Sequence, residues 1–196
     1  MNQPLTLDIV IVGVGGQGTL LASKIIGHLA VRLGYDVKVS EVHGMSQRGG
    51  SVITYLRLGT DVHAPLVEQQ GADYILAFEQ LEALRVLPYL KDTGCLIVNT
   101  QRILPLPVII GAAEYPGDII SDFQDSGVDI IAANALSMAV EAGNQRAVNT
   151  VLLGILANKL PFEKEDWLAA IREVVPQRFA DVNLTAFESG YSFSGR

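Results

Sequence analysis

A glycine-rich turn near the start of the chain limits the possible folds more than any other feature. Residues 7–12 are apolar except for Asp8, and the sequence GVGGQG, residues 13–18, follows them directly. Apolar residues then recur at helical spacing over about residues 18–33. A strand, a tight turn and a helix in this order predict the first unit of an open parallel sheet.

The same alternation continues along the rest of the chain. We predict further strands over residues 37–40, 51–58, 74–78, 95–98, 107–110 and 128–133, a helix over residues 79–90, and amphipathic helical segments near residues 148–160 and 163–175. The predicted fold is a single α/β domain spanning residues 1–196, doubly wound and Rossmann-like, with a mainly parallel sheet and a helical C-terminal part. The 49% hydrophobic content fits a sheet that is buried on both faces, together with a subunit interface.

Charge and cysteine content narrow the classes of function. A net charge of −7 argues against nucleic acid as a partner. The single cysteine, Cys95, opens an apolar strand, where we expect it to be buried, and it cannot form a disulfide or a four-cysteine metal site within this chain. The three histidines are too scattered for a metal-ligand pattern. No apolar run is long enough to span a membrane, and the N-terminus lacks the pattern of a signal peptide, so we expect a cytoplasmic protein.

Polar residues and glycines stand where the predicted strands end. In open parallel sheets, binding sites form beyond the carboxyl ends of the strands. The residues expected there are the glycine turn, Glu41 and His43, Glu79, Asn99 with Thr100, and Asn134. We therefore predict a functional rim at this edge of the sheet.

The glycine turn has two interpretations. Its sequence fits G-x-G-x-x-G between a strand and a helix, which is the context of dinucleotide binding. Glu41 lies roughly where a ribose-binding carboxylate is expected. Free N–H groups at the start of the helix could hold an anion, and the candidate binding residues are Gly13, Gly15, Gly16, Gln17 and Gly18. Alternatively, the glycines only let the helix pack closely on the sheet.

The sequence SEVHGMSQRGGSV, residues 40–52, is richer in unusual residues than a simple strand connection. Arg48 could direct a planar guanidinium toward a phosphate, a carboxylate or a partner chain. Gly49 and Gly50 would allow close approach of backbone or a positive φ. His43 is a weak candidate for a general acid or base, because an isolated histidine beside a glycine is more often an ordinary surface residue.

Glu79, Glu82 and Arg85 are spaced three residues apart on a predicted helix. This spacing places the three side chains on one helix face. We expect a solvated face, with Glu79 as the one possible functional residue.

Four segments together resemble a known family. They are GVGGQG, SEVHGMSQRGGSV, AFEQLEALR (residues 77–85) and VNTQRILP (residues 98–105). They resemble the γ-type subunit of 2-oxoacid:ferredoxin oxidoreductases, and the HGMSQRGG form of the loop is most similar to the indolepyruvate branch of that family. The resemblance covers nearly the whole chain and is most specific in its first half.

The resemblance implies an activity shared with a larger subunit. Family members oxidatively decarboxylate a 2-oxoacid with coenzyme A, and they form an acyl-CoA, carbon dioxide and reduced ferredoxin. Thiamine diphosphate, Mg²⁺ and iron–sulfur clusters carry this chemistry and reside mainly on the large α subunit. A chain with one cysteine agrees with this division. The resemblance thus implies two partners, the large subunit and ferredoxin.

The resemblance also suggests roles for the two loops. The segment of residues 40–52, which we call the second loop, would contact the large subunit. Its candidate contact residues are Glu41, His43, Gly44, Ser46, Gln47, Arg48, Gly49 and Gly50. The glycine turn would hold a phosphate of coenzyme A, another anion or nothing. Two other functions stay open: a stand-alone NAD(P)- or flavin-dependent dehydrogenase, for which only His43 offers a catalytic group, and a nucleotide-binding regulatory module.

Overall fold

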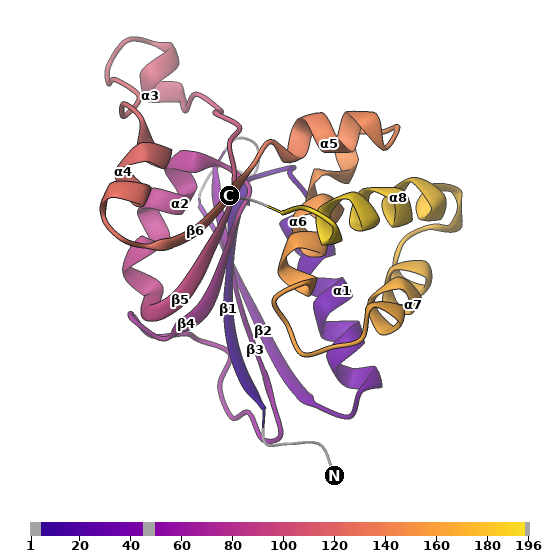
Figure 1. The fold of residues 1–196 in the computed structure, drawn as a ribbon. Coiled ribbons are helices and arrows are strands. Elements are labelled where there is room, and N and C mark those ends of the chain that lie inside the picture. Colours follow the sequence, from indigo (N-terminus) through magenta and orange to yellow (C-terminus); the bar gives the residue numbers. More distant parts are fainter. Residues whose placement is uncertain (1–4, 45–49, 195–196) are drawn as a thin grey trace.

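The structure is a computed structural model that describes residues 5–44 and 50–194. Its centre is a six-stranded sheet with the order β2-β3-β1-β4-β5-β6 (Figure 1). The strands are β1 (Thr6–Val14), β2 (Asp36–His43), β3 (Ser51–Gly59), β4 (Ala72–Ala77), β5 (Leu90–Asn99) and β6 (Asp129–Ala133).

The sheet is mainly parallel, as predicted. β1, β4, β5 and β6 pair in parallel, whereas β3 pairs antiparallel with both β1 and β2. β2 therefore runs in the same direction as β1. Five strands end along one edge of the sheet, which we call the carboxyl edge, and β3 starts there, with Ser51 opposite Val14.

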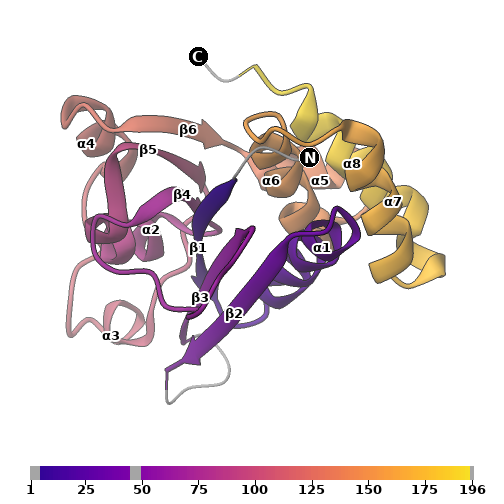
Figure 2. The ribbon, with the colours of Figure 1, turned by 90° about the horizontal axis from the view of Figure 1, so that it is seen from below.

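Helices cover both faces of the sheet (Figures 1 and 2). One face carries α2 (Gln80–Val86) and α4 (Ile119–Asp125), and the other carries α1 (Thr19–Arg32), α5 (Ala135–Glu141), α6 (Val148–Ala157), α7 (Lys164–Val174) and α8 (Ala180–Tyr191). Consecutive residues of β1 alternate between the two layers: Ile9 and Ile11 pack on the α1 side, and Val10 and Val12 on the α2 side. The doubly wound α/β prediction is confirmed.

The predicted strand over residues 107–110 is wrong. This segment contains the short helix α3 (Leu106–Ile109), and no strand pairs with it. Pro105 is the N-cap and Pro107 lies in the first turn, where the missing N–H of proline costs no hydrogen bond. The run of β-branched residues suggested a strand, but these side chains lie at the surface instead of in a sheet.

The predicted helix over residues 79–90 is shorter than expected. Glu79 is the N-cap, α2 ends at Val86, and a 3-10 turn η1 (Leu87–Tyr89) leads into β5. Pro88 lacks the N–H that a continuing helix needs.

Candidate functional site

The glycine turn joins β1 to α1 at the carboxyl edge. Gly16 and Gly18 have φ values of 102° and 88°, a region that side chains other than glycine rarely adopt. The Gly15 N–H donates to the Gly50 carbonyl over 2.9 Å, so the turn is tied to the start of β3. The positive φ values explain why positions 16 and 18 are glycine. The hydrogen bond to Gly50 fixes the turn beside the second loop.

The Gln17 side chain is used inside the turn. Its Oε1 accepts the Val14 N–H over 2.7 Å, and its Nε2 donates to the Phe78 carbonyl over 3.0 Å. Gln17 therefore clamps the turn between β1 and the end of β4. Gln17 is the only one of the five predicted anion-binding residues that has a side chain, and both polar atoms of that side chain already form hydrogen bonds within the protein.

The start of α1 has the features of an anion site. Its N-cap, Gly18, provides no side-chain hydrogen bond, and the first turn contains no acidic residue. The first backbone bonds to Gly18 come from Leu21 and Ala22, so the N–H groups of Thr19 and Leu20 have no partner within the described part of the chain. Unpaired N–H groups and the helix dipole make such an end favourable for negative charge.

A cavity of about 560 Å³ opens beside this helix end. Gly16 and Gly18 line one side of it, and Gln101, Gln145 and Arg146 contribute from the connections around β5 and α6. Among the described residues that line it, Arg146 carries the only charge. A positive side chain thus shares this cavity with two glycines of the turn that leads into α1.

Close packing against α6 fixes the position of the turn. Asn149 is buried, and a Cβ added to Gly18 would lie 3.1 Å from its Nδ2 atom. The third glycine of the motif is therefore required both for its positive φ and for its contact with α6. The tight-packing interpretation of the motif thus holds at Gly18, while the cavity keeps the binding interpretation open.

The carboxylate of Glu79, which lies between β4 and α2, holds the surrounding backbone in place. It is 1% exposed and accepts hydrogen bonds from the N–H groups of Glu82 and Ile103, each over 3.0 Å, and from the Tyr115 hydroxyl over 2.5 Å. Glu82 is also buried, contacts Ser51 and Arg85, and has its pKa raised by burial. The predicted solvated face is therefore wrong for Glu79 and Glu82, because Ser51, Ile103 and Tyr115 contact these carboxylates and cover this helix start.

Asn99 and Asn134 also serve the backbone. The Asn99 amide donates to the Phe78 carbonyl over 3.2 Å and accepts the Ala135 N–H over 3.2 Å. Asn134 caps α5 by accepting the Ser137 N–H over 3.1 Å. Polar residues do gather at the carboxyl edge, as predicted, but these two support the connections.

Only part of the second loop lies in the described residues. His43 is exposed, and its Nε2 lies 2.6 Å from Oε1 of Glu41. The other Glu41 oxygen is buried and has no hydrogen-bond partner among residues 5–44 and 50–194. Gly44 and Gly50 close the ends of the connection through bonds to Ser51 and Gly15. The predicted contact residues Ser46, Gln47, Arg48 and Gly49 lie outside the described residues. His43 does not line the cavity at the glycine turn.

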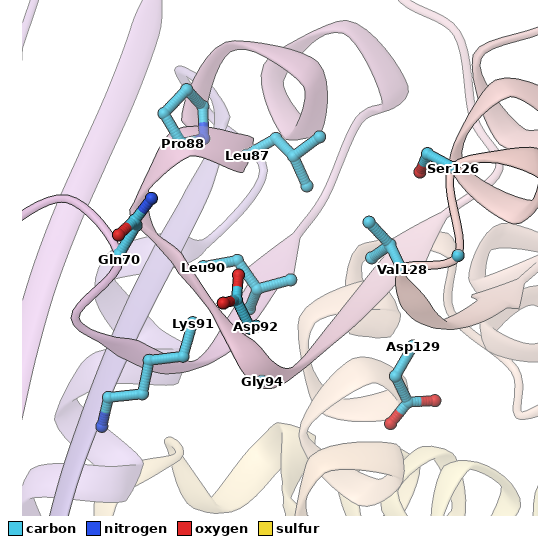
Figure 3. Close-up of a pocket in the computed structure, with 11 residues that line it drawn as sticks. Gln70, Leu87, Pro88, Leu90, Lys91, Asp92, Gly94, Ser126, Val128 and Asp129 are labelled. Atoms are coloured by element: carbon cyan, nitrogen blue, oxygen red, sulfur yellow. The ribbon is translucent and has the colours of Figure 1, made fainter.

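A second cavity, of about 310 Å³, lies at the opposite edge of the sheet (Figure 3). Leu90, Lys91 and Val128 line it at the amino ends of β5 and β6. The Lys91 Nζ is paired with Asp73 over 2.5 Å. Because its one lysine is already neutralised and parallel sheets bind ligands at the other edge, this cavity is the weaker candidate.

Nearly the whole chain matches one protein family. The model described as pyruvate ferredoxin/flavodoxin oxidoreductase matches residues 8–193. The chain belongs to this family. The resemblance based on the glycine turn and the second loop is thereby confirmed.

Relatives within the pyruvate ferredoxin/flavodoxin oxidoreductase family cover almost the whole chain. The indolepyruvate oxidoreductase subunit IorB of Thermococcus kodakarensis is 46% identical over 93% of this chain and 93% of its own. The γ subunit of a keto/oxoacid ferredoxin oxidoreductase from Geobacter sulfurreducens has the same fold, with a TM-score of 0.70, 24% identity and coverage of 94% and 96%. A 2-oxoglutarate:ferredoxin oxidoreductase from Magnetococcus marinus also has this fold, with a TM-score of 0.75 and 17% identity. The match covers 100% of this chain and 32% of the Magnetococcus marinus chain.

Sequence reasoning missed two residues of this family member's carboxyl edge. Arg146 reaches the cavity from the start of α6, and Tyr115 binds Glu79 from beyond α3. Both are far from the glycine turn in the sequence, and no spacing rule connects them to it. A lone arginine just before a long apolar helix was the only available signal for Arg146.

The described residues offer neither a metal site nor a membrane-spanning helix. Residues 5–44 and 50–194 contain no group of three or more histidine, cysteine, aspartate or glutamate side chains placed to hold a metal ion. Cys95 is buried as predicted, and burial raises the pKa of its thiol to about 12. Within the same residues, no helix is both long enough and apolar enough to cross a membrane.

Proposed function

We propose that this chain is the small subunit of a 2-oxoacid:ferredoxin oxidoreductase of the indolepyruvate type. The observation that carries the proposal is the 46% identity, over nearly full length, to a protein named as an indolepyruvate oxidoreductase subunit. The complete enzyme would convert an aryl pyruvate and coenzyme A into an acyl-CoA, carbon dioxide and reduced ferredoxin. The substrate and the products come from the family resemblance.

The redox groups of this reaction do not fit the described residues of this chain. No cluster of metal-ligating side chains is present among them, and Cys95 is a buried thiol whose high pKa disfavours the thiolate that binds iron. We therefore assign thiamine diphosphate, Mg²⁺ and the iron–sulfur clusters to the large subunit. This chain would contribute binding surfaces at its carboxyl edge.

We further propose that the glycine turn holds a phosphate of coenzyme A or a similar anion. The guanidinium of Arg146 lines the same cavity as Gly16 and Gly18, and the unpaired N–H groups of Thr19 and Leu20 follow directly at the start of α1, which supports this assignment. Titration of the assembled enzyme with coenzyme A tests it. Arg146→Gln should weaken coenzyme A binding, whereas Arg178→Gln, which removes an exposed arginine on Phe179, should leave it unchanged. Equal affinity in the Arg146 variant would refute this site.

The second loop would contact the large subunit. Glu41, His43, Gly44 and Gly50 lie at the carboxyl edge close to the glycine turn, which supports this role for residues 41–50. The role of Ser46, Gln47, Arg48 and Gly49 rests on the sequence. Arg48→Ala should weaken assembly or turnover while the chain stays folded, and normal assembly with normal turnover would remove the role of Arg48.

Co-purification tests the proposed function. A tagged chain expressed with its large subunit should yield a brown complex that reduces ferredoxin when indolepyruvate and coenzyme A are both present. Titration of the lone chain with NAD(H), NADP(H) and flavins tests the alternatives. Hydride transfer by the lone chain would favour a dehydrogenase, and nucleotide binding without chemistry would favour a regulatory module.

A further inference from the structure

An apolar arm projects from the carboxyl edge. We use this name for residues 103–113, with the sequence ILPLPVIIGAA, which contain no charged residue and include α3. Figure 1 shows α3 standing away from the layers of the sheet. Leu106, Ile109 and Ile110 are 67%, 65% and 67% exposed. Large apolar side chains gathered on one exposed segment are a mark of an interaction site.

The base of the arm is firmly held although its tip is exposed. Oε1 of Glu79 accepts the Ile103 N–H at one end of the arm and the Tyr115 hydroxyl just beyond the other. The Arg102 guanidinium donates to the Gly117 carbonyl over 3.1 Å and lies 5.5 Å from the centre of the Tyr115 ring. A buried carboxylate and an arginine thus pre-organise an apolar segment that has little packing of its own.

We propose that the apolar arm inserts into an apolar groove on the large subunit. This inference rests on the proposed function, because it requires that the large subunit exists and binds here. Ile103, at the base of the arm, lines the cavity beside the glycine turn. The arm is therefore continuous with the surface that the glycine turn and the second loop present to the same partner.

The size of the arm also favours this occupant. A stable interface uses about 20–30 residues on each side, so contacts between two arms alone would be too small to hold a second copy of this chain. A large subunit that covers the carboxyl edge would bury the arm as one part of a wider surface.

Charge disfavours a membrane as the occupant. Glu114 follows the arm directly and Asp118 lies five residues beyond its end, whereas after Arg102 the next basic residue is Arg146. Surfaces that bind anionic lipid carry clusters of lysine and arginine beside their apolar residues. The uncharged arm with an acidic flank fits an apolar protein groove better.

Substitutions at the tip of the arm test the proposal. Ile109→Asp and Ile110→Asp each place a charge at an exposed position, so folding should be retained and the melting temperature should stay unchanged. The matched control is Leu66→Asp, because Leu66 is 57% exposed and lies in the loop after β3, which ends at the opposite edge of the sheet. The measurement is the affinity of each purified variant for the purified large subunit.

The predicted outcome is a loss of affinity of tenfold or more in both arm variants and less than twofold in the control. Ile109→Leu should retain binding, because it keeps an apolar side chain. Unchanged affinity in both arm variants, or an equal loss in Leu66→Asp, would overturn the arm proposal while leaving the proposed function intact. The arm proposal would also be overturned if the wild-type chain formed a homodimer and the arm substitutions dissociated that homodimer without weakening the complex with the large subunit. Failure of the wild-type chain to bind the large subunit would remove the proposed function, and the arm proposal with it.

Discussion

The Glu79 carboxylate and the Tyr115 hydroxyl form a hydrogen bond of 2.5 Å between residues 36 positions apart in the sequence. The same carboxylate accepts backbone N–H groups from Glu82 and Ile103. One buried side chain therefore caps α2 and also fixes both ends of the apolar arm. The stability of the carboxyl edge and its proposed docking role depend on the same residue.

Glu79→Gln should destabilise the chain. The Glu79 carboxylate accepts all of its hydrogen bonds, from the N–H groups of Glu82 and Ile103 and from the Tyr115 hydroxyl. An amide NH₂ in place of one oxygen would face one of these donors and leave that donor unpaired. The expected loss is about 1–3 kcal/mol of unfolding free energy. Urea denaturation measures it, and the exposed Glu68→Gln serves as the control, with an expected change within about 0.5 kcal/mol. Equal stability of the two variants would contradict the anchoring role of Glu79.

Gln17→Ala should also cost about 1–3 kcal/mol of stability, because the Val14 N–H and the Phe78 carbonyl would each lose a partner. Gln145→Ala is the matched control, since Gln145 lines the same cavity and is exposed. Thermal and urea denaturation of both variants distinguish a structural clamp from a ligand contact. A Gln17 variant that keeps its stability but loses coenzyme A affinity would show that Gln17 serves the ligand instead.

Helix packing in the C-terminal part leaves no room for side chains at two glycines. A Cβ on Gly154 would lie 2.2 Å from the Phe187 carbonyl oxygen, and one on Gly190 would lie 2.0 Å from that of Val151. Gly154→Ala and Gly190→Ala should each cost about 3 kcal/mol or more, since α6 and α8 must move apart. Gly27→Ala, in α1 with open space around it, should be neutral or stabilise by about 0.5–1 kcal/mol. Melting curves showing similar stability for all three variants would exclude this close approach.

The Cys95 thiol links stability to alkaline pH. Burial, and then the neighbouring Asp129, raise its pKa from 9.0 to about 12 in the folded chain. Because the folded state favours the neutral thiol, this contribution is complete below about pH 9 and is lost as the pH rises toward 12. The unfolding free energy of the wild-type chain should therefore fall more steeply over this range than that of Cys95→Ala.

Labelling provides a second measurement of the same property. A thiol reagent at pH 8 should modify native Cys95 far more slowly than Cys95 in the urea-unfolded chain, since only the thiolate reacts. Equal labelling rates, or parallel pH profiles of the two proteins, would show that the thiol is not protected.

The alternation of strands and helices was predictable because burial on both faces leaves a strong pattern in sequence. The glycine turn was predictable because its positive φ values at Gly16 and Gly18 demand glycine. The segment from Leu106 to Ile109 misled the prediction, since β-branched residues on an exposed arm have the composition of a buried strand. Glu79 and Glu82 looked solvated because helical spacing reveals which residues share a face but not what covers that face.

The site was less predictable than the fold. The pairing of Gln17 with Val14 is local, yet no rule assigns a role to a free position of the glycine motif. Arg146 reaches the cavity only because α6 packs against the start of α1, as the contact between Asn149 and Gly18 shows. Contacts of this kind depend on tertiary packing, which spacing along a single sequence does not encode.

Reconstitution of activity from separately purified subunits tests the central claim most directly. The assay is the reduction of ferredoxin by indolepyruvate in the presence of coenzyme A. We predict no reduction by this chain alone, little or none by the large subunit alone, and full activity when the two are mixed. Turnover by this chain alone, or a large subunit that is fully active without it, would contradict the account.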